Sequence, residues 1–361
     1  MSYNLLRQRL RPNFKTQIPT NLLQHKASER WIHMLQENWR LLRREFSLLW
    51  HGQKKLECTV IPADVRRILW ISTSINNIGD AVMALSARVL LAPRYHCSVL
   101  LNPKYAELFQ DDQVFTEVYC DPQRINDDYD FIILDSVKNR SLTVKNKYFK
   151  HKRFAHFRGH FDGIEFNWVL FSFHRINALL NSQYQQVELD KMARPQLYFN
   201  EIKAVNSLSV VIAIGGEDRL RRVFHSWGAV ISALRTKYPQ LAIILVGSAN
   251  GVVDAAQISL DKQITNLVGK LSLADTAKVI NQSPYFIGCD GGLMHIANAL
   301  GKAGVSLFGY FAPEYRLTAT SNLCGLYHGA TVDEIPYLDV INAFIKVLNN
   351  SRILSNNFPI L

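Results

Sequence analysis

The chain has 361 residues, of which 48% are hydrophobic and 20% charged, so it can bury one or two compact cores and is neither a disordered tail nor a small disulfide-stapled scaffold. Its 41 Lys and Arg outnumber 30 Asp and Glu, and the charge of +11 favours an anionic partner, which leaves nucleic acid, a membrane surface or an acidic small molecule open. The five cysteines are scattered without a CxxC pair, which disfavours a disulfide framework or a zinc site and favours a reducing compartment.

The N-terminal extension, residues 1–55, carries most of the charge. It holds 11 basic and three acidic residues, a net charge of +8, and the remainder is close to neutral. Apolar residues recur in it with the period of about 3.6 that is typical of an α-helix with one apolar stripe, namely Trp31, Leu35, Trp39, Leu42, Phe46 and Leu49. Packing of this stripe on the protein's own body and contact with an anionic membrane or a partner both stay open.

No segment of the chain resembles a membrane anchor or a secretory signal. The longest apolar runs fall short of the ~20 residues that a membrane-spanning helix needs, and the arginine-rich start lacks an apolar centre. We therefore expect a cytoplasmic protein that meets a membrane only from its side.

From residue 56 onward the pattern changes to alternating strands and helices. A first series predicts a helix at 81–91 and strands at 65–72, 97–101, 118–120 and 131–134. A second series predicts strands at 210–214, 242–246, 285–287 and 304–308, with helices at 226–237, 254–260, 273–280 and 293–300. Strands buried on both faces and alternating with helices indicate two doubly wound parallel sheets, with the ligand in a cleft at the carboxyl ends of the strands.

A polar, proline-containing stretch at 190–209 separates the two series. We therefore expect four parts, which are a basic helical extension at 1–55, Rossmann-like domains at 56–195 and 196–335, and a helical segment at 336–361 that packs back on the N-terminal domain. The basic, aromatic stretch at 148–175 suits either contacts with phosphate groups or a solvated connection.

Ile78-Gly79-Asp80 follows the first strand of the first series. A carboxylate at the carboxyl end of a strand is suitably placed for a general base. Gly-Asp is also a common turn, so a purely structural role is the alternative.

The segment 214–224 follows the first strand of the second series. Gly215 and Gly216 free the backbone for a close approach, while Arg221 and Arg222 suit a diphosphate through charge-assisted hydrogen bonds. The alternative is a set of solvated surface arginines.

The segment 288–295, Gly-Cys-Asp-Gly-Gly-Leu-Met-His, joins a strand to a helix. Adjacent glycines at a helix start let backbone N–H groups approach a phosphate. Asp290 beside a diphosphate would be repulsive unless it holds neutral hydroxyls, so the pattern indicates a nucleotide-sugar. The alternative is that Asp290 only caps the helix.

Together, and in this order, these motifs resemble glycosyltransferase family 9, the bacterial lipopolysaccharide heptosyltransferases. The likeness runs over roughly residues 65–320 and rests on the segments 68–90, 129–142, 266–280 and 287–309. It implies the two-Rossmann glycosyltransferase B (GT-B) fold, with the acceptor on the first domain and the ADP-heptose donor on the second.

The resemblance also implies roles for individual residues. Asp80 matches the family's catalytic base, Asp290 matches its donor-sugar contact, and Arg222 or Arg221 falls where the family has a phosphate-binding lysine. We expect further donor contacts from Gly215, Gly216, Gly291, Gly292, Leu293 and His295. We expect acceptor contacts from Asn77, Gly79, Asn139 and Arg140. Ser72-Thr73 and Gly291 depart from the family pattern, which has a basic residue and a hydroxyl residue there.

The expected activity is an inverting transfer of heptose from ADP-heptose to the lipopolysaccharide inner core, without a cofactor or metal beyond the donor substrate. The implied partners are a lipid A–Kdo glycolipid and the anionic inner face of the inner membrane. A GT-B binding protein that has lost catalysis and a transferase for another nucleotide-sugar are the alternatives. A dinucleotide-dependent oxidoreductase is disfavoured because no GxGxxG opens the first strand, and nothing but charge favours nucleic acid.

Overall fold

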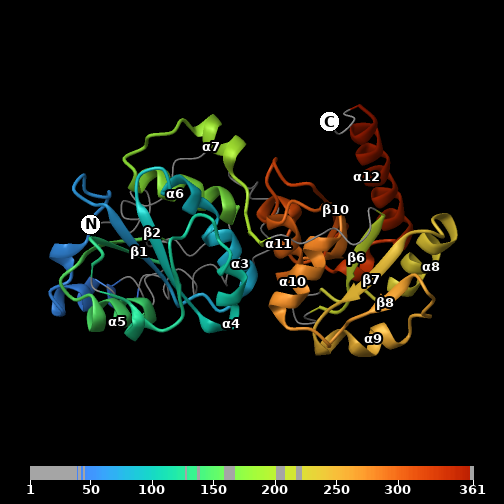
Figure 1. The fold of residues 1–361 in the computed structure, drawn as a ribbon, viewed down its shortest axis with the longest axis horizontal. Helices are drawn as coiled ribbons and strands as arrows, with labels where there is room; N and C mark the ends of the chain where they lie inside the picture. Colours follow the sequence, from blue (N-terminus) through green and yellow to red (C-terminus); the bar gives the residue numbers. More distant parts are fainter. Residues whose placement is uncertain are drawn as a thin grey trace. The chain divides into compact units, whose positions relative to one another are not determined.

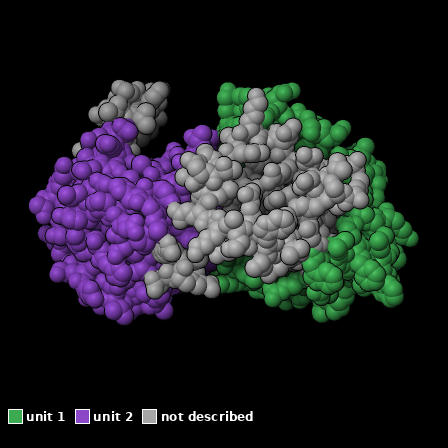
Figure 2. Space-filling view, turned by 180° about the vertical axis from the view of Figure 1, so that it is seen from behind, with its two compact units in different colours: residues 1–194 green, residues 195–361 purple. Residues whose placement is uncertain are grey.

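A computed structural model describes residues 45–126, 128–135, 139–157, 167–200, 208–216 and 222–357, together with residues 39, 42 and 43. The chain divides into two compact units, Met1–Arg194 and Pro195–Leu361, which are coloured separately in Figure 2. Each unit contains one all-parallel sheet, which confirms the expected α/β fold class of two doubly wound domains.

The sheet of unit 1 has the strand order β3-β2-β1-β4-β5. Its strands are β1 (Arg67–Ser72), β2 (His96–Leu101), β3 (Val118–Tyr119), β4 (Phe131–Leu134) and β5 (Arg153–His156). Its helices are α3 (Ile78–Ala84), α4 (Pro103–Ala106), α5 (Asn139–Tyr148), α6 (Trp168–Leu179) and α7 (Gln186–Met192). Short 3-10 helices are η2 (Lys54–Leu56), η3 (Ser86–Leu90), η4 (Glu107–Phe109) and η5 (Pro122–Arg124).

The central strand β1 is apolar throughout because both of its faces are covered. Leu69 and Ile71 point to the face that α5 covers, whereas Trp70 points to the opposite face and contacts Phe157 at 4.9 Å between ring centroids. In Figure 1, α5 and α6 lie on opposite sides of this sheet.

The stretch 148–175 differs from what we expected. It contains strand β5 and the start of α6, and most of their residues are buried, so it is neither a solvated connection nor an open basic surface where it is described. His156, for example, is only 2% exposed.

The sheet of unit 2 has the strand order β11-β10-β9-β6-β7-β8. Its strands are β6 (Ser209–Ala213), β7 (Ala242–Val246), β8 (Ile264–Asn266), β9 (Tyr285–Cys289), β10 (Ala303–Phe308) and β11 (Leu323–Tyr327). Its helices are α8 (Trp227–Lys237), α9 (Val252–Ala256), α10 (Leu273–Gln282), α11 (Gly292–Ala299) and α12 (Tyr337–Asn357). Short 3-10 helices are η7 (Ala249–Gly251), η8 (Pro313–Tyr315) and η9 (Val332–Glu334).

Helices cover both faces of this sheet as well. Helices α8 and α12 pack together, and α10 packs on α11 (Figure 1). The last helix departs from the expected docking on the N-terminal domain: Val340, Ile341, Phe344 and Leu348 are buried in the core of unit 2. The apolar stripe of α12 is thus used by its own unit.

The part of the N-terminal extension that is described is helical at residues 39, 42–43 and 45–50. Trp31 and Leu35 of the expected stripe lie outside the described residues. Leu48 is fully buried in the core of unit 1, whereas the described stripe residues are exposed. None of the described helices is long and apolar enough to cross a membrane.

Candidate functional site

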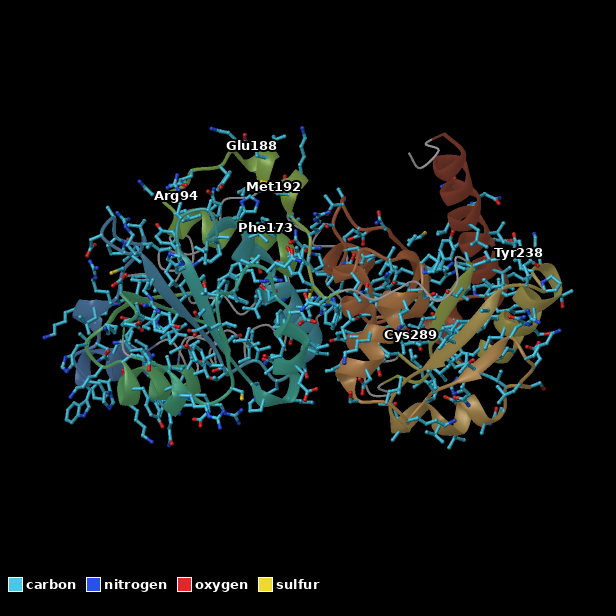
Figure 3. The ribbon with its side chains drawn as sticks, viewed as in Figure 1. Arg94, Phe173, Glu188, Met192, Tyr238 and Cys289 are labelled. Carbon is cyan, nitrogen blue, oxygen red and sulfur yellow. The ribbon has the colours of Figure 1, made fainter. Side chains whose placement is uncertain are left out.

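In unit 2, the site is built where β9 ends. Cys289, labelled in Figure 3, is the last residue of β9, and the backbone N–H of Asp290 still donates to the Leu307 carbonyl of β10, at 2.8 Å. Helix α11 begins two residues later at Gly292. The parallel sheet thereby places Asp290 at the carboxyl edge, directly before a helix N-terminus.

The carboxylate of Asp290 does not cap this helix. The N-cap residue is Gly291, and no side chain caps it. Instead, Asp290 is 3% exposed and lies among basic side chains. Oδ2 accepts a hydrogen bond from Nη2 of Arg222 at 2.7 Å, while Oδ1 lies 3.6 Å from Nε2 of His295 and 4.0 Å from Nε of Arg316.

The electrostatics of this cluster favour a bound anion. Burial alone would raise the pKa of Asp290, but the contact with His295 and the charges of Arg316 and Arg222 hold it well below its usual range. One carboxylate faces two guanidinium groups, so positive charge is in excess. Among the described residues, Asp290 Oδ1, Arg222 Nε and His295 Nδ1 are buried without a hydrogen-bond partner. A ligand with both hydroxyl and phosphate groups would satisfy such atoms.

The loop after β6 brings Arg222 to this cluster. A Cβ on Gly216 would lie 2.1 Å from the carbonyl oxygen of Arg222, so only glycine permits this approach of the two backbones. Two residues further on, Phe224 is buried against Trp227 with 4.8 Å between ring centroids. Arg222 is therefore fixed from both sides, and it is not a solvated surface arginine.

Gly215, Gly291, Gly292 and Leu293 also border this region. Gly215 has φ of 92°, and its Cβ would meet Gly251, so the loops after β6 and β7 pack closely. Gly291, Gly292 and Leu293 are partly exposed at the start of α11, where first-turn N–H groups have no partner within the helix. Arg221 lies outside the described residues.

In unit 1, the first loop presents Asp80. Asn77 is the N-cap residue of α3, Gly79 is buried, and Asp80 lies half-buried in the first turn. Nδ2 of Asn77 donates to Oδ2 of Asp80 at 3.4 Å, which holds a carboxylate at the helix N-terminus. Arg140 of α5 is exposed, and its Nη1 donates to Oδ1 of Asn76 at 3.3 Å. Asn139 begins α5, and its side chain is not described.

Sequence reasoning overlooked the residue that fixes this loop, Asp135. It follows β4, is fully buried and accepts hydrogen bonds from the Ser74 N–H at 2.8 Å and from Ser141 Oγ at 2.6 Å. The hydroxyls of Ser74 and Ser141 lie 2.7 Å apart. The available signal was a carboxylate at the end of the apolar run of β4, next to the strand that precedes Asp80.

Arg316 is the second residue that was overlooked. It lies just after η8, is 7% exposed, and its guanidinium stacks 4.5 Å from the Phe311 ring centroid. No sequence pattern distinguishes Arg316 from an ordinary surface arginine of a loop. Its role becomes visible only in the fold, which places it near Asp290.

One segment of the chain, shorter than half of its length, matches a family model. Residues 181–326 match the model of glycosyltransferase family 9 (heptosyltransferase). The matched segment belongs to glycosyltransferase family 9. This confirms the resemblance and the enzyme class, a heptosyltransferase-like glycosyltransferase. The family 9 segment contains β6–β10 and the whole cluster around Asp290, whereas Asp80 lies outside it.

Solved structures support the fold over more of the chain. The glycosyltransferase family 9 protein of Veillonella parvula is 14% identical, covering 81% of this chain and 100% of its own, with a TM-score of 0.65. The E. coli ADP-heptose lipopolysaccharide heptosyltransferase II is 16% identical, covering 79% and 99%, with a TM-score of 0.59. The E. coli heptosyltransferase WaaC with ADP is 14% identical, covering 78% and 99%, with a TM-score of 0.53. No curated protein matches the sequence.

At these identities the likeness establishes the GT-B-type fold and leaves the substrates open. Within the described residues, no three His, Cys, Asp or Glu side chains gather as they would to hold a metal ion. The five cysteines are free thiols.

Proposed function

We propose that the chain is an inverting glycosyltransferase that moves a heptose from ADP-heptose to the inner core of lipopolysaccharide or lipooligosaccharide. The observation that carries the proposal is the buried Asp290 carboxylate among Arg222, His295 and Arg316 at the start of α11. A nucleotide-sugar combines the two kinds of group that this cluster recognises, diphosphate and hydroxyl. The domain at 196–335 is then the donor domain, and the domain at 56–195 is the acceptor domain.

The donor diphosphate would bind to Arg222 and to the backbone N–H groups of Gly291 and Gly292. Their preorganised positive charge stabilises the diphosphate as it leaves, because charge develops there during transfer. Asp290 would accept hydrogen bonds from sugar hydroxyls, and His295 would contact the phosphate side. Structures of E. coli heptosyltransferase WaaC with ADP and with ADP-2-deoxy-2-fluoro heptose agree with an ADP-sugar donor.

On the acceptor side, Asp80 would act as the general base. It takes the proton of an acceptor hydroxyl while that oxygen attacks the anomeric carbon from the face opposite the nucleotide, and the configuration inverts in one displacement. Asn77, Gly79, Asn139 and Arg140 would position the acceptor. The phosphorylated lipid A–Kdo region is an anion, which suits the exposed Arg140 and the charge of +8 in the N-terminal extension.

Two variants separate the roles of the carboxylates. Asp80→Asn is expected to lower the transfer rate by roughly 10²–10⁴, the usual range of general-base help, and to leave the affinity for ADP unchanged. Glu107→Gln, an exposed carboxylate of the same unit, is the control. Retention of more than about a tenth of the rate in Asp80→Asn would remove Asp80 from the proposed role.

Asp290→Asn tests the sugar contact. We expect the affinity for ADP-heptose to fall at least about tenfold more than the affinity for ADP, a difference of ~1.4 kcal/mol. Asp275→Asn on α10 is exposed and serves as control. Equal losses for both ligands would contradict the assignment.

A second candidate is a transferase for another nucleotide-sugar, which the environment of Gly291 favours. The family pattern has Ser or Thr at this position, yet a Cβ on Gly291 would lie 3.8 Å from its nearest neighbour, so space is open for a different sugar. Thermal shifts with a series of nucleotide-sugars test this, because a ligand at 100 times its Kd stabilises by about 2.7 kcal/mol. A larger shift with another nucleotide-sugar than with ADP-heptose would select the second candidate.

A further inference from the structure

The N-terminal extension presents an exposed aromatic and aliphatic face. We call this face the outer face and define it by its side chains and their exposed fractions: Trp39 (68%), Leu42 (65%), Phe46 (64%), Leu49 (65%) and Trp50 (76%). Phe46 and Trp50 stack on each other, with 5.8 Å between ring centroids. Apolar side chains in contiguous exposed groups mark a surface that binds a partner or a membrane.

The position of Leu48 decides whether the apolar stripe of this helix packs on the protein's own body or faces away from it. With about 100° per residue, Leu48 lies on the opposite side of the helix from Trp39, Phe46 and Trp50. Leu48 is the side chain that packs into the core of unit 1. Where it is described, the helix therefore turns the buried Leu48 towards the protein and its wide apolar stripe away from it.

The helix end is fixed to unit 1 by polar contacts as well. The buried Gln53 donates its N–H to the Leu48 carbonyl at 2.8 Å, and its side chain accepts a hydrogen bond from Lys145 of α5. Nζ of Lys54 lies 2.8 Å from Glu45 and 2.6 Å from Glu57. A partner that binds the outer face is thus bound to unit 1 and not to a loose tail.

Charge indicates which partner fits. The extension carries a net +8, Arg43 is exposed beside the outer face, and Lys55 is exposed just beyond it. Tryptophan rings next to basic side chains suit the boundary between acyl chains and anionic headgroups, where each Lys or Arg strengthens attachment. A second copy of this chain would bring the same positive charge and repel.

We propose that the outer face docks on the surface of an anionic lipid bilayer and lies in the plane of its headgroups. This goes beyond the proposed function, since vesicle binding requires neither donor nor acceptor. The occupant is the bilayer surface itself and not a protein.

The test is sedimentation of the full-length chain with phosphatidylcholine vesicles, with and without phosphatidylglycerol. The variant replaces Trp39, Phe46 and Trp50 with serine. Its control replaces Val253 and Leu260 of unit 2, which are 71% and 58% exposed, with serine. We expect wild type and control to bind the anionic vesicles alike, and the outer-face variant to bind at least about tenfold more weakly.

A charge variant and a folding check complete the experiment. Arg43→Glu is expected to weaken binding to anionic vesicles and to leave binding to phosphatidylcholine unchanged, and added salt is expected to weaken the wild type. ADP affinity and thermal midpoint, which should match wild type in every variant, report on folding. Equal vesicle binding by wild type and outer-face variant would overturn the proposal, as would self-association of the wild type that the variant loses.

Discussion

The Nη2 atom of Arg222 donates to Oδ2 of Asp290 at 2.7 Å, although the two residues are 68 positions apart in the sequence. The contact exists because β6 and β9 are neighbours in the parallel sheet, so the loops that follow them meet at one edge. It joins the carboxylate proposed for the sugar to the guanidinium proposed for the diphosphate. A donor that binds to one of these two side chains would therefore also affect the other.

Gly216→Ala is expected to weaken donor binding by displacing Arg222. The new Cβ would fall 2.1 Å from the Arg222 carbonyl, so the loop must shift and carry the guanidinium away from Asp290. We expect an increase of about tenfold in the Kd for ADP, measured by calorimetry. Gly228→Ala, where nothing lies within 4 Å of the added Cβ, is the matched control. An unchanged Kd in Gly216→Ala would show that the loop relaxes without moving Arg222.

Arg316→Met is expected to weaken donor binding through Asp290. Removal of this charge leaves the buried carboxylate with less compensation and raises its pKa, because Arg316 is one of the charges that lower it. We expect the Kd for ADP-heptose to rise by roughly 10–100-fold, as for loss of a charged contact, and Arg316→Lys to recover part of it. Arg235→Met, which removes an arginine of α8 paired with Asp261, should bind like wild type. Equal Kd values for Arg316→Met and Arg316→Lys would contradict a role for the charge.

Lys145 is expected to make the stability of unit 1 depend on pH. Burial lowers the pKa of its ammonium group from 10.5 to about 8, so above pH 8 the unfolded chain binds more protons than the folded chain. The contribution of Lys145 to the free energy of unfolding should therefore rise with pH between about 8 and 10.5. Urea unfolding of wild type and Lys145→Met across this range measures it. The difference between them should increase with pH across this range.

Loss of the ion pair between Arg88 and Asp112 is expected to lower the stability of unit 1 strongly. The two side chains are 0% and 1% exposed and lie 2.5 Å apart. Asp112→Asn would leave the guanidinium buried without its counter-charge, which costs about 3–5 kcal/mol. Asp64→Asn breaks the ion pair between Asp64 and Arg153, whose side chains are 70% and 37% exposed. It should lower the free energy of unfolding by at most about 1 kcal/mol. Denaturant midpoints compare the two, and similar losses would contradict the buried-pair argument.

Strands that are apolar throughout could be located from the sequence. The expected bounds at 131–134 and 242–246 coincide with β4 and β7, because both strands are continuous apolar runs. Strands β5, β8 and β11 were not expected. Charged and histidine residues in β5 and a glycine in the middle of β11 conceal their apolar faces.

Those parts of the candidate site that lie in local sequence motifs could be predicted. Asp290 stands directly after β9, and Asp80 lies in the helix start that follows the loop after β1; the parallel fold sends such residues to the ligand edge. Arg316 could not be identified, because its importance lies in a contact with a distant loop, whereas Asp135 was overlooked although it stands directly after β4. The exposure of the outer face could not be predicted either. Periodicity identifies an apolar stripe, but it does not show that the helix packs on unit 1 through Leu48, on its other side.

If the outer face docks on a bilayer and the acceptor is lipid-borne, as we propose, the anchoring of Leu48 in the core of unit 1 has a kinetic consequence. A chain attached through a rigid helix diffuses in the plane of the lipids, so its search for the acceptor is two-dimensional. Confinement raises the local concentration of acceptor without any new contact at Asp80. Turnover on vesicle-borne acceptor would then depend on surface density, while turnover on a detergent-dispersed acceptor would depend on bulk concentration.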